Sequence, residues 1–475
     1  MDKQKLYQSV EKNKDILTEL SDQIWSFAEL SMKEFKSAEY YCKLMEEQGF
    51  AVERELCGVP TAFLGKYGSG KPVIGILGEF DALDGLSQEA GVAEHKPLAG
   101  NTCGHGCGHN MLGAASLGAA MAVKEAIAAG ELHGTVIFYG CPGEEGCAGK
   151  TFMARDGMFR DLDAAITWHP GDVNQIMTGS NAASLQFEYS FTGVAAHAAG
   201  DPQNGRSALD AAELMNVGVQ FLREHMGKKE SVHYSFLDVG GVSPNVVQPT
   251  ATVLYMIRGE NVRKAKALKK RVDDIAKGAA LMTGTTVTFR QIDGTASTIS
   301  NQVLEKLLND NLLEAPLPEY TSEEWDLATK VKETYSTEEL PGTGMEENAV
   351  LKSFMQEKTQ GGKRALNDFV VPYYPAFTYS PGSTDVGDVS WLTPTAQFSA
   401  VTWASGSPGH SWQNVSLGRS SIGYKGLLYA AKVLAASCAD LMEDPELLQK
   451  ARAEFMVSAA EGYDCPIGPE VIPGE

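Results

Sequence analysis

Hydrophobic positions in the first 170 residues alternate between helical and strand-like patterns. Apolar residues recur at helical spacing over residues 4–31 and 37–49. An alanine-rich helix is predicted over roughly 109–130, ending at Gly130. Four short apolar runs predict strands: TAFLGKY, KPVIGILGEF, GTVIFYG and AAITWH. This alternation predicts βαβ units that build a mostly parallel sheet with helices on both of its faces.

The pattern changes at about residue 184. Two amphipathic helices, SALDAAELMNVGVQFLREH and NVRKAKALKKRVDDIAKGAALM, then stand among four strand-like segments in the order β-α-β-β-α-β. This order is typical of a ferredoxin-like α+β unit. Because an α/β pattern resumes afterwards, we predict that residues 184–294 form an inserted domain, and that residues 1–183 and 295–475 together form the domain that receives it.

The C-terminal part has one weakly patterned region. Residues 310–380 mix two helical stretches, SEEWDLATKVKETY and NAVLKSFMQE, with segments rich in glycine and proline. AQFSAVTW predicts a last core strand, and residues 416–442 predict a long closing helix. The predicted fold class is therefore α/β, with a mostly parallel catalytic sheet and an inserted α+β lid or dimerisation domain.

Composition narrows the possible partners and the location. A chain of 475 residues is long enough for two domains. Its net charge of −21 argues against binding to nucleic acid or to anionic membranes. No run of eighteen apolar residues predicts a membrane-spanning helix, and the charged N-terminal segment has no apolar signal-peptide core. The eight scattered cysteines form no disulfide framework, so we expect a cytoplasmic protein.

Side chains of the types that bind divalent metal ions follow the predicted strands. The pair Glu144–Glu145 follows GTVIFYG, and His169 ends AAITWH. His410 lies shortly after AQFSAVTW, whereas Cys107 and His109 stand where the alanine-rich helix begins. In an open α/β sheet, ligands bind at the carboxyl ends of the strands. These side chains are therefore predicted to face one edge of the sheet.

Each of these side chains has a simpler explanation when it is taken alone. A lone histidine after a strand is more often structural than a ligand, a single Cys-x-His is commonly a packed thiol, and adjacent glutamates usually lie on a solvated helix. Their joint placement at successive strand ends favours a metal site, since thiolate, imidazole and carboxylate bind zinc-like ions. A second carboxylate beside a ligand provides a base for water, which indicates a metallohydrolase.

Six longer motifs stand in order along the chain: HGCGHNMLGAA, CPGEEG, TWHPG, GVAAHAAGDPQNGRSALDA, GGVSPNVVQPTATVLYMIRG and GHSWQNVSLG. In these motifs the sequence resembles the M20 family of metallopeptidases and amidohydrolases. The resemblance implies that Glu144 is the general base. It also implies two divalent metal ions, zinc or manganese, with five ligands: Cys107, His109, Glu145, His169 and His410.

Further roles follow from the same resemblance. Asp81, in EFDAL, matches an acidic residue that orients a ligand from behind. His197, on the inserted domain, matches a histidine that reaches an active site across a dimer and stabilises the oxyanion. Asn245 and Arg258 match residues that hold the substrate carboxylate.

The chain departs from the common family pattern at three positions near the ligands. Glu79 replaces a more usual His or Asp, Asn110 replaces an aspartate, and Leu112 occupies what is often a histidine. The segment 310–380 is also longer than in typical members. These departures bear on the tuning of the site and on the fit of the substrate.

The activity implied by the resemblance is hydrolysis of an amide bond in a small N-acyl amino acid, such as p-aminobenzoyl-glutamate, or in a dipeptide. Two alternatives stay open. One is a cysteine hydrolase in which Cys107 is the nucleophile. The other is a non-catalytic subunit that keeps the fold. The expected assembly is a homodimer or a heteromer with a related subunit.

Overall fold

A seven-stranded sheet forms the centre of the computed structural model, which describes residues 1–346, 348–375 and 378–474. Its strand order is β1-β2-β4-β3-β5-β13-β6. The strands are β1 (Ala51–Arg54), β2 (Phe63–Ser69), β3 (Val73–Glu79), β4 (Gly134–Cys141), β5 (Ala164–Gly171), β6 (Gln175–Met177) and β13 (Thr395–Val401). The four central strands, β4, β3, β5 and β13, are parallel, whereas β1, β2 and β6 are antiparallel to their neighbours.

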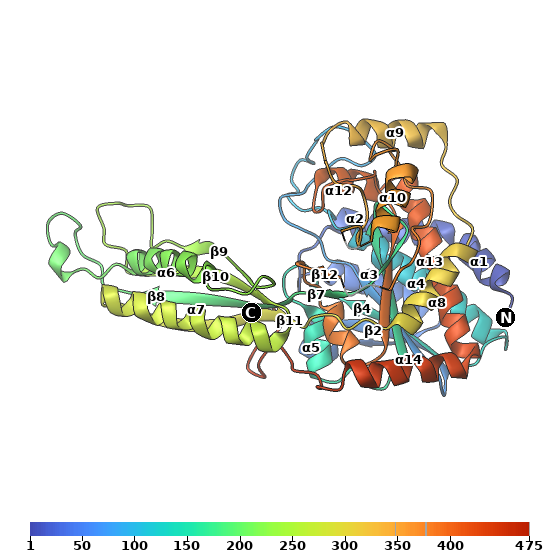
Figure 1. Ribbon diagram of the computed structural model, residues 1–475, viewed down its shortest axis with the longest axis horizontal. Coiled ribbons are helices and arrows are strands. Elements are labelled where there is room, and N and C mark those ends of the chain that lie inside the picture. The colour runs from blue at the N-terminus through green and yellow to red at the C-terminus, as the bar shows by residue number, and fades with distance from the viewer. Residues whose placement is uncertain (347, 376–377, 475) are drawn as a thin grey trace.

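Helices cover both faces of this sheet (Figure 1). The larger core contains residues of α1 (Lys3–Lys12), α2 (Lys14–Phe27), α3 (Phe35–Glu47), α4 (His109–Ala128), α8 (Gln302–Glu314), α13 (Ser421–Glu443) and α14 (Pro445–Ser458). On the opposite face lie α5 (Gly149–Arg155) and α11 (Val386–Ser390). Three more helices pack in smaller clusters beyond the sheet: α9 (Ser322–Lys332), α10 (Ala349–Lys358) and α12 (Trp412–Gly418).

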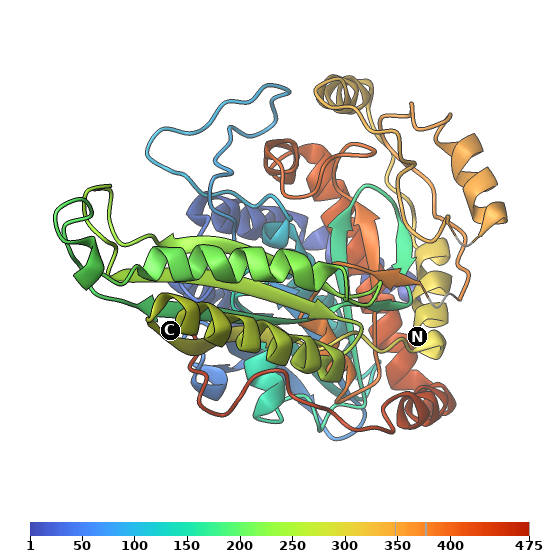
Figure 2. The same cartoon turned by 60° about the vertical axis from the view of Figure 1, so that its left-hand side comes forward.

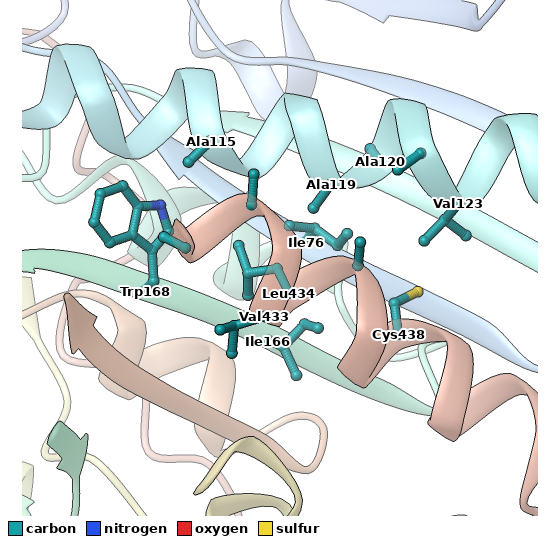
Figure 3. Close-up of a cluster of buried hydrophobic side chains, with 14 of the residues drawn as sticks. Ile76, Ala115, Ala119, Ala120, Val123, Ile166, Trp168, Val433, Leu434 and Cys438 are labelled. Carbon is teal, nitrogen blue, oxygen red and sulfur yellow. The ribbon is translucent and has the colours of Figure 1, made fainter. Parts of the chain in front are cut away.

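Two of these helices, α4 and α13, pack directly against the middle of the sheet. Figure 3 shows alanines of α4, Val433 and Leu434 of α13, Ile76 of β3 and Ile166 of β5 gathered in one buried cluster. Small side chains on α4 permit this close packing. By length and composition α4 could cross a membrane, but 78% of its apolar stretch is buried inside the protein. It therefore occupies the position of a core helix.

Residues 183–295, called the arm below, project from one side of the sheet (Figure 1). The arm consists of β8 (Ala183–Thr192), α6 (Ala208–Arg223), β9 (Ser231–Asp238), β10 (Thr250–Gly259), α7 (Val262–Thr283) and β11 (Thr286–Thr295). Its antiparallel sheet has the order β11-β8-β10-β9, and both helices pack on one face of it (Figure 2). At its base, β7 (Ser180–Asn181) pairs with β12 (Tyr379–Ser380). The predicted fold class is confirmed.

Two helices expected to be continuous are interrupted. The segment 4–31 divides at Asn13, whose side-chain amide donates a hydrogen bond to the Ser9 carbonyl at 2.9 Å. Such a side chain competes with the backbone for hydrogen bonds and ends a helix. The closing helix is likewise preceded by the separate helix α12, and the Ser420 hydroxyl accepts from the Gly423 N–H at the start of α13. At the second junction the Ser420 side chain supplies the N-cap of α13.

Candidate active site

The candidate ligands meet at the carboxyl ends of the central strands. Asp81 follows β3, and His169 lies near the end of β5. Glu144 and Glu145 follow β4. His410 stands between β13 and α12 with a left-handed backbone φ of 50°. A positive φ is uncommon for a residue other than glycine, and residues in such conformations cluster at functional sites.

A glycine turn places two of the candidate ligands at the start of α4. Gly108 caps the helix with φ 78°, a conformation that favours glycine. A Cβ at this position would also lie 2.8 Å from the Pro170 side chain. The turn therefore brings Cys107 and His109, on either side of this glycine, against the end of β5.

His109 is fully buried, and its ring is fixed by Asp81. Its Nδ1 donates to Asp81 Oδ1 at 2.9 Å, and the other Asp81 oxygen accepts from Ser31 Oγ and from the Glu145 N–H. The His109 Nε2 atom consequently faces the cluster, 3.2 Å from Glu79 Oε2 and 4.0 Å from Glu145 Oε1. This is the contact that the orienting role expected of Asp81 requires.

The remaining imidazoles also present Nε2 to their neighbours. His169 Nδ1 donates to the Pro170 carbonyl at 2.7 Å, which leaves Nε2 facing Cys107 Sγ at 3.3 Å. Burial lowers the pKa of His169 and so favours the neutral imidazole, which is the form that binds metal ions. His410 Nε2 lies 3.4 Å from Glu145 Oε2.

Several buried nitrogen and oxygen atoms of this cluster face one another without a hydrogen-bond partner among the described residues. His109 Nε2, Glu79 Oε2 and Glu145 Oε1 are buried and have no hydrogen-bond partner among the described residues. Three trios have ligand atoms within 4.8 Å of one another: Cys107–His109–His169, Cys107–Glu145–His410 and Glu79–His109–Glu144. Buried acceptors in such contact need a proton or a cation between them. The mixture of thiolate, imidazole and carboxylate donors fits divalent metal ions.

Glu144 lies beside the cluster in an environment that favours a protonated carboxyl group. Burial, together with the nearby charges of Glu79, Asp385 and Glu145, raises the pKa of Glu144 well above its ordinary value. A carboxylate of this kind can accept a proton at neutral pH and hold it until the proton is transferred. The position therefore suits a general base.

Two supporting groups were not predicted from the sequence. Glu34 is buried and accepts from the Gly143 N–H at 2.9 Å, which fixes the turn before Glu144. Lys150 of α5 is also buried, and its ammonium lies 2.6 Å from Glu79 and 2.5 Å from Asp385. In the sequence, Lys150 stands between Gly149 and Thr151, two residues before the apolar run 152–154 of a short helix. No sequence pattern connects it with Asp385, which is 235 residues away.

The three residues expected to bind the substrate or the oxyanion belong to the arm, outside the central sheet. His197 and Asn245 belong to the loops that follow β8 and β9, at the end of the arm farthest from the central sheet (Figure 1). These loops are joined there, because the Ala198 N–H donates to the Asn245 carbonyl at 2.9 Å. Arg258 lies near the base of the arm on β10, paired in register with Ser184. Of the site residues predicted from the sequence, the five candidate ligands, Asp81 and Glu144 lie together within one chain.

Comparisons with known proteins agree on one family. A family model described as a peptidase dimerisation domain matches residues 180–284. The chain is 43% identical to a subunit of p-aminobenzoyl-glutamate hydrolase from Escherichia coli over 473 residues, which cover 98% of this chain and 97% of that protein. This coverage extends over both the central sheet and the arm.

Solved structures share the fold. An aminobenzoyl-glutamate utilization protein from Klebsiella pneumoniae has a TM-score of 0.59 at 16% identity, covering 92% of this chain and 97% of that one. A protein from Bacillus subtilis, described as a dinuclear metal-binding peptidase of the M20 family, has a TM-score of 0.54 at 17% identity, covering 91% and 99%. Taken with the relative that matches almost the whole length, these findings show that the chain belongs to the M20 family and is an amidohydrolase.

Proposed function

We propose that this enzyme hydrolyses the amide bond of a small N-acyl amino acid of the p-aminobenzoyl-glutamate type, or of a dipeptide, with two divalent metal ions. The observation that carries the proposal is the buried cluster beside Glu144, whose metal-binding atoms include three with no hydrogen-bond partner among the described residues. The name of the Escherichia coli relative supports the substrate class. The dinuclear description of the Bacillus subtilis structure agrees with the number of ions.

In this proposal the ions are held by five side chains: Cys107, His109, Glu145, His169 and His410. Zinc or manganese, when bound, would polarise the amide carbonyl and acidify the attacking water. The carboxylate of Glu144 takes the proton of that water and later delivers it to the leaving nitrogen. Asp81 keeps the His109 ring in position throughout.

His197 is prepared to donate a hydrogen bond. Its Nδ1 accepts from the N–H groups of Ala199 and Gly200, at 3.2 and 3.0 Å. The neutral ring therefore carries its hydrogen on Nε2, which is suited to an oxyanion. Since its loop lies far from the cluster of its own chain, we propose that His197 acts in the site of a partner subunit.

Substrate binding is assigned to the same arm. The Arg258 Nε atom is buried and has no hydrogen-bond partner among the described residues, so its guanidinium can bind the carboxylate of an amino acid. Asn245 would contribute an amide to the substrate bound in the partner's site. Burial lowers the pKa of Arg258, but the group stays cationic at neutral pH.

An apolar strip on the arm supports a dimer, either of identical chains or with a related subunit. The edge strand β9 exposes Tyr234, Phe236 and Leu237, and the neighbouring helix α6 exposes Val217 and Phe221. Phe221 is 72% exposed. An unpaired edge strand beside exposed apolar side chains is a surface that a second chain can cover.

Removal of the metal tests the proposal directly. Protein treated with a chelator should lose hydrolysis, and reloading with Mn or Zn should restore it at about two ions per chain. Elemental analysis counts the bound ions. Hydrolysis is measured on a screen of N-acyl-glutamates, N-acyl-aspartates and dipeptides. Full activity in metal-free protein would reject the metal mechanism. Turnover of dipeptides alone would reject the N-acyl amino acid class.

Mixed subunits test the placement of His197 in a partner's site. Glu144→Gln and His197→Ala homodimers should each be nearly inactive. After subunit exchange, half of the dimers have one intact site, so activity should return to about a quarter of the wild-type value. A mixture that stays inactive, while exchange is verified by differently tagged chains, would place His197 outside the partner's site.

The cysteine alternative rests on the contact of Cys107 with His169. Burial and the charge of Glu145 raise the pKa of this thiol well above its ordinary value, which opposes a free nucleophilic thiolate. The alternative also leaves Glu144 and His410 without a role. If bound metal protects Cys107 from alkylation, and mass spectrometry finds no acyl-enzyme, the metal mechanism is supported and the cysteine mechanism is rejected.

A further inference from the structure

Glu79 ends β3 directly behind the cluster, and its carboxylate is held by a buried lysine. Its Oε1 atom lies 2.6 Å from the ammonium of Lys150, which also contacts Asp385 Oδ1 at 2.5 Å. The Lys150 backbone N–H donates to the other Asp385 oxygen at 2.8 Å. The side chains of Lys150 and Asp385 are fully buried, and that of Glu79 is 3% exposed. One oxygen of Glu79 is therefore fixed.

The second oxygen of Glu79 points into the cluster. Oε2 has no hydrogen-bond partner among the described residues and lies 3.2 Å from His109 Nε2. The ligand atoms of Glu79, His109 and Glu144 lie within 4.8 Å of one another. His109 uses Nδ1 for Asp81, so Nε2 and Glu79 Oε2 are held together only by a proton or by a cation.

We propose that Glu79 is a sixth protein ligand of the metal cluster, binding through Oε2, and that Lys150 is its positioning residue. This inference rests on the proposed function, because it assumes that the cluster binds divalent ions. Lys150 occupies Oε1 and so restricts Glu79 to one metal-binding oxygen. It also compensates the charge of a carboxylate that would otherwise be buried beside Glu144 and Glu145.

A sixth ligand of this kind changes the chemistry of the site. A carboxylate oxygen suits manganese, whereas zinc is commonly satisfied by four nitrogen and sulfur donors. The ion bound next to His109 should therefore depend on Glu79 more strongly when it is manganese than when it is zinc.

The variant Glu79→Gln tests this proposal with little change of shape. Its amide oxygen can still accept from Lys150, which turns the NH₂ group toward His109 Nε2, and an NH₂ group does not bind a cation. Calorimetric titration of the chelated protein with Mn and with Zn should show affinity falling by about tenfold or more at one of two sites, which is at least the effect of losing an outer-shell partner. The loss should be larger for Mn.

A matched control is Glu305→Gln. Glu305 is equally buried, but its carboxylate accepts from the hydroxyls of Thr178 and Tyr373, away from the cluster. Affinity for both ions should be unchanged in that variant. Asp385→Asn, which loosens Lys150 without touching the cluster, should weaken manganese binding less than Glu79→Gln does.

An unchanged or higher metal affinity in Glu79→Gln would have a different explanation. If Glu79 served only as the counter-ion of a protonated His109, its replacement would free His109 for metal, and affinity would rise or stay the same. Either outcome would overturn the proposal. Should the Gln variant fail to fold, Glu79→Asp gives the same test, because it retracts the carboxylate from the cluster by one methylene group. Wild-type protein that binds no divalent ion would instead reject the proposed function.

Discussion

Replacing Glu144 with Gln should leave both metal ions bound and lower kcat by about 10²–10⁴-fold, which is the usual contribution of a positioned general base. The amide cannot accept the proton of the attacking water, while the five proposed ligands are untouched. Because burial and neighbouring carboxylates raise the pKa of Glu144, the wild-type carboxyl is also suited to deliver that proton to the leaving nitrogen. Steady-state kinetics together with elemental analysis make the measurement.

The adjacent residue provides the control for this prediction. Glu145→Gln alters a proposed ligand, since Glu145 lies 3.4 Å from His410 and 4.0 Å from His109. It should lose metal as well as turnover. Near-native activity in Glu144→Gln would refute the base assignment, and loss of metal in that variant would make Glu144 a ligand.

Replacing Lys150 with Met should lower the free energy of unfolding by about 3–5 kcal/mol, the cost of breaking a buried ion pair on one side. The substitution leaves Glu79 and Asp385 as buried carboxylates without their shared cation. Lys150 holds the pKa of Glu79 below its ordinary value against the opposing effect of burial. Urea denaturation of the metal-free protein measures the change without a contribution from metal binding.

Lys330→Met is the matched control for Lys150→Met. Lys330 pairs with Asp326 on the exposed side of α9, and both side chains are more than half exposed. Ion pairs of this kind contribute little to stability, so unfolding should hardly change. A similarly small effect of Lys150→Met would contradict the prediction that this buried cation stabilises the fold.

The candidate ligands could be found from the sequence because each one stands next to a recognisable local signal. Glu144 follows an apolar strand, His169 lies near the end of another, and His109 begins the alanine-rich helix that the sequence predicts. Parallel strands carry such residues to one edge of a sheet, whatever the order of the strands. The predicted fold class depended on the same local patterns and is confirmed.

The supporting groups could not be found in this way. Lys150 and Asp385 meet only because α5 and α11 pack on the same face of the sheet, and Glu34 reaches Gly143 across 109 residues. Neither contact leaves a periodic pattern in the sequence. The break at Asn13 was missed for a related reason, since its hydrogen bond to Ser9 overrides a continuous amphipathic pattern.

The arm carries Arg258 near its base, on β10, and His197 at its far end, in the loop that follows β8 of the same sheet. Under the proposed arrangement, each arm would serve its own chain's site with its base and the partner's site with its far end. A tilt that brings Arg258 onto a substrate must then also move the oxyanion donor of the other subunit. Catalysis in the two halves of a dimer would be mechanically coupled, and cooperativity between the sites would come from the geometry of the arm itself.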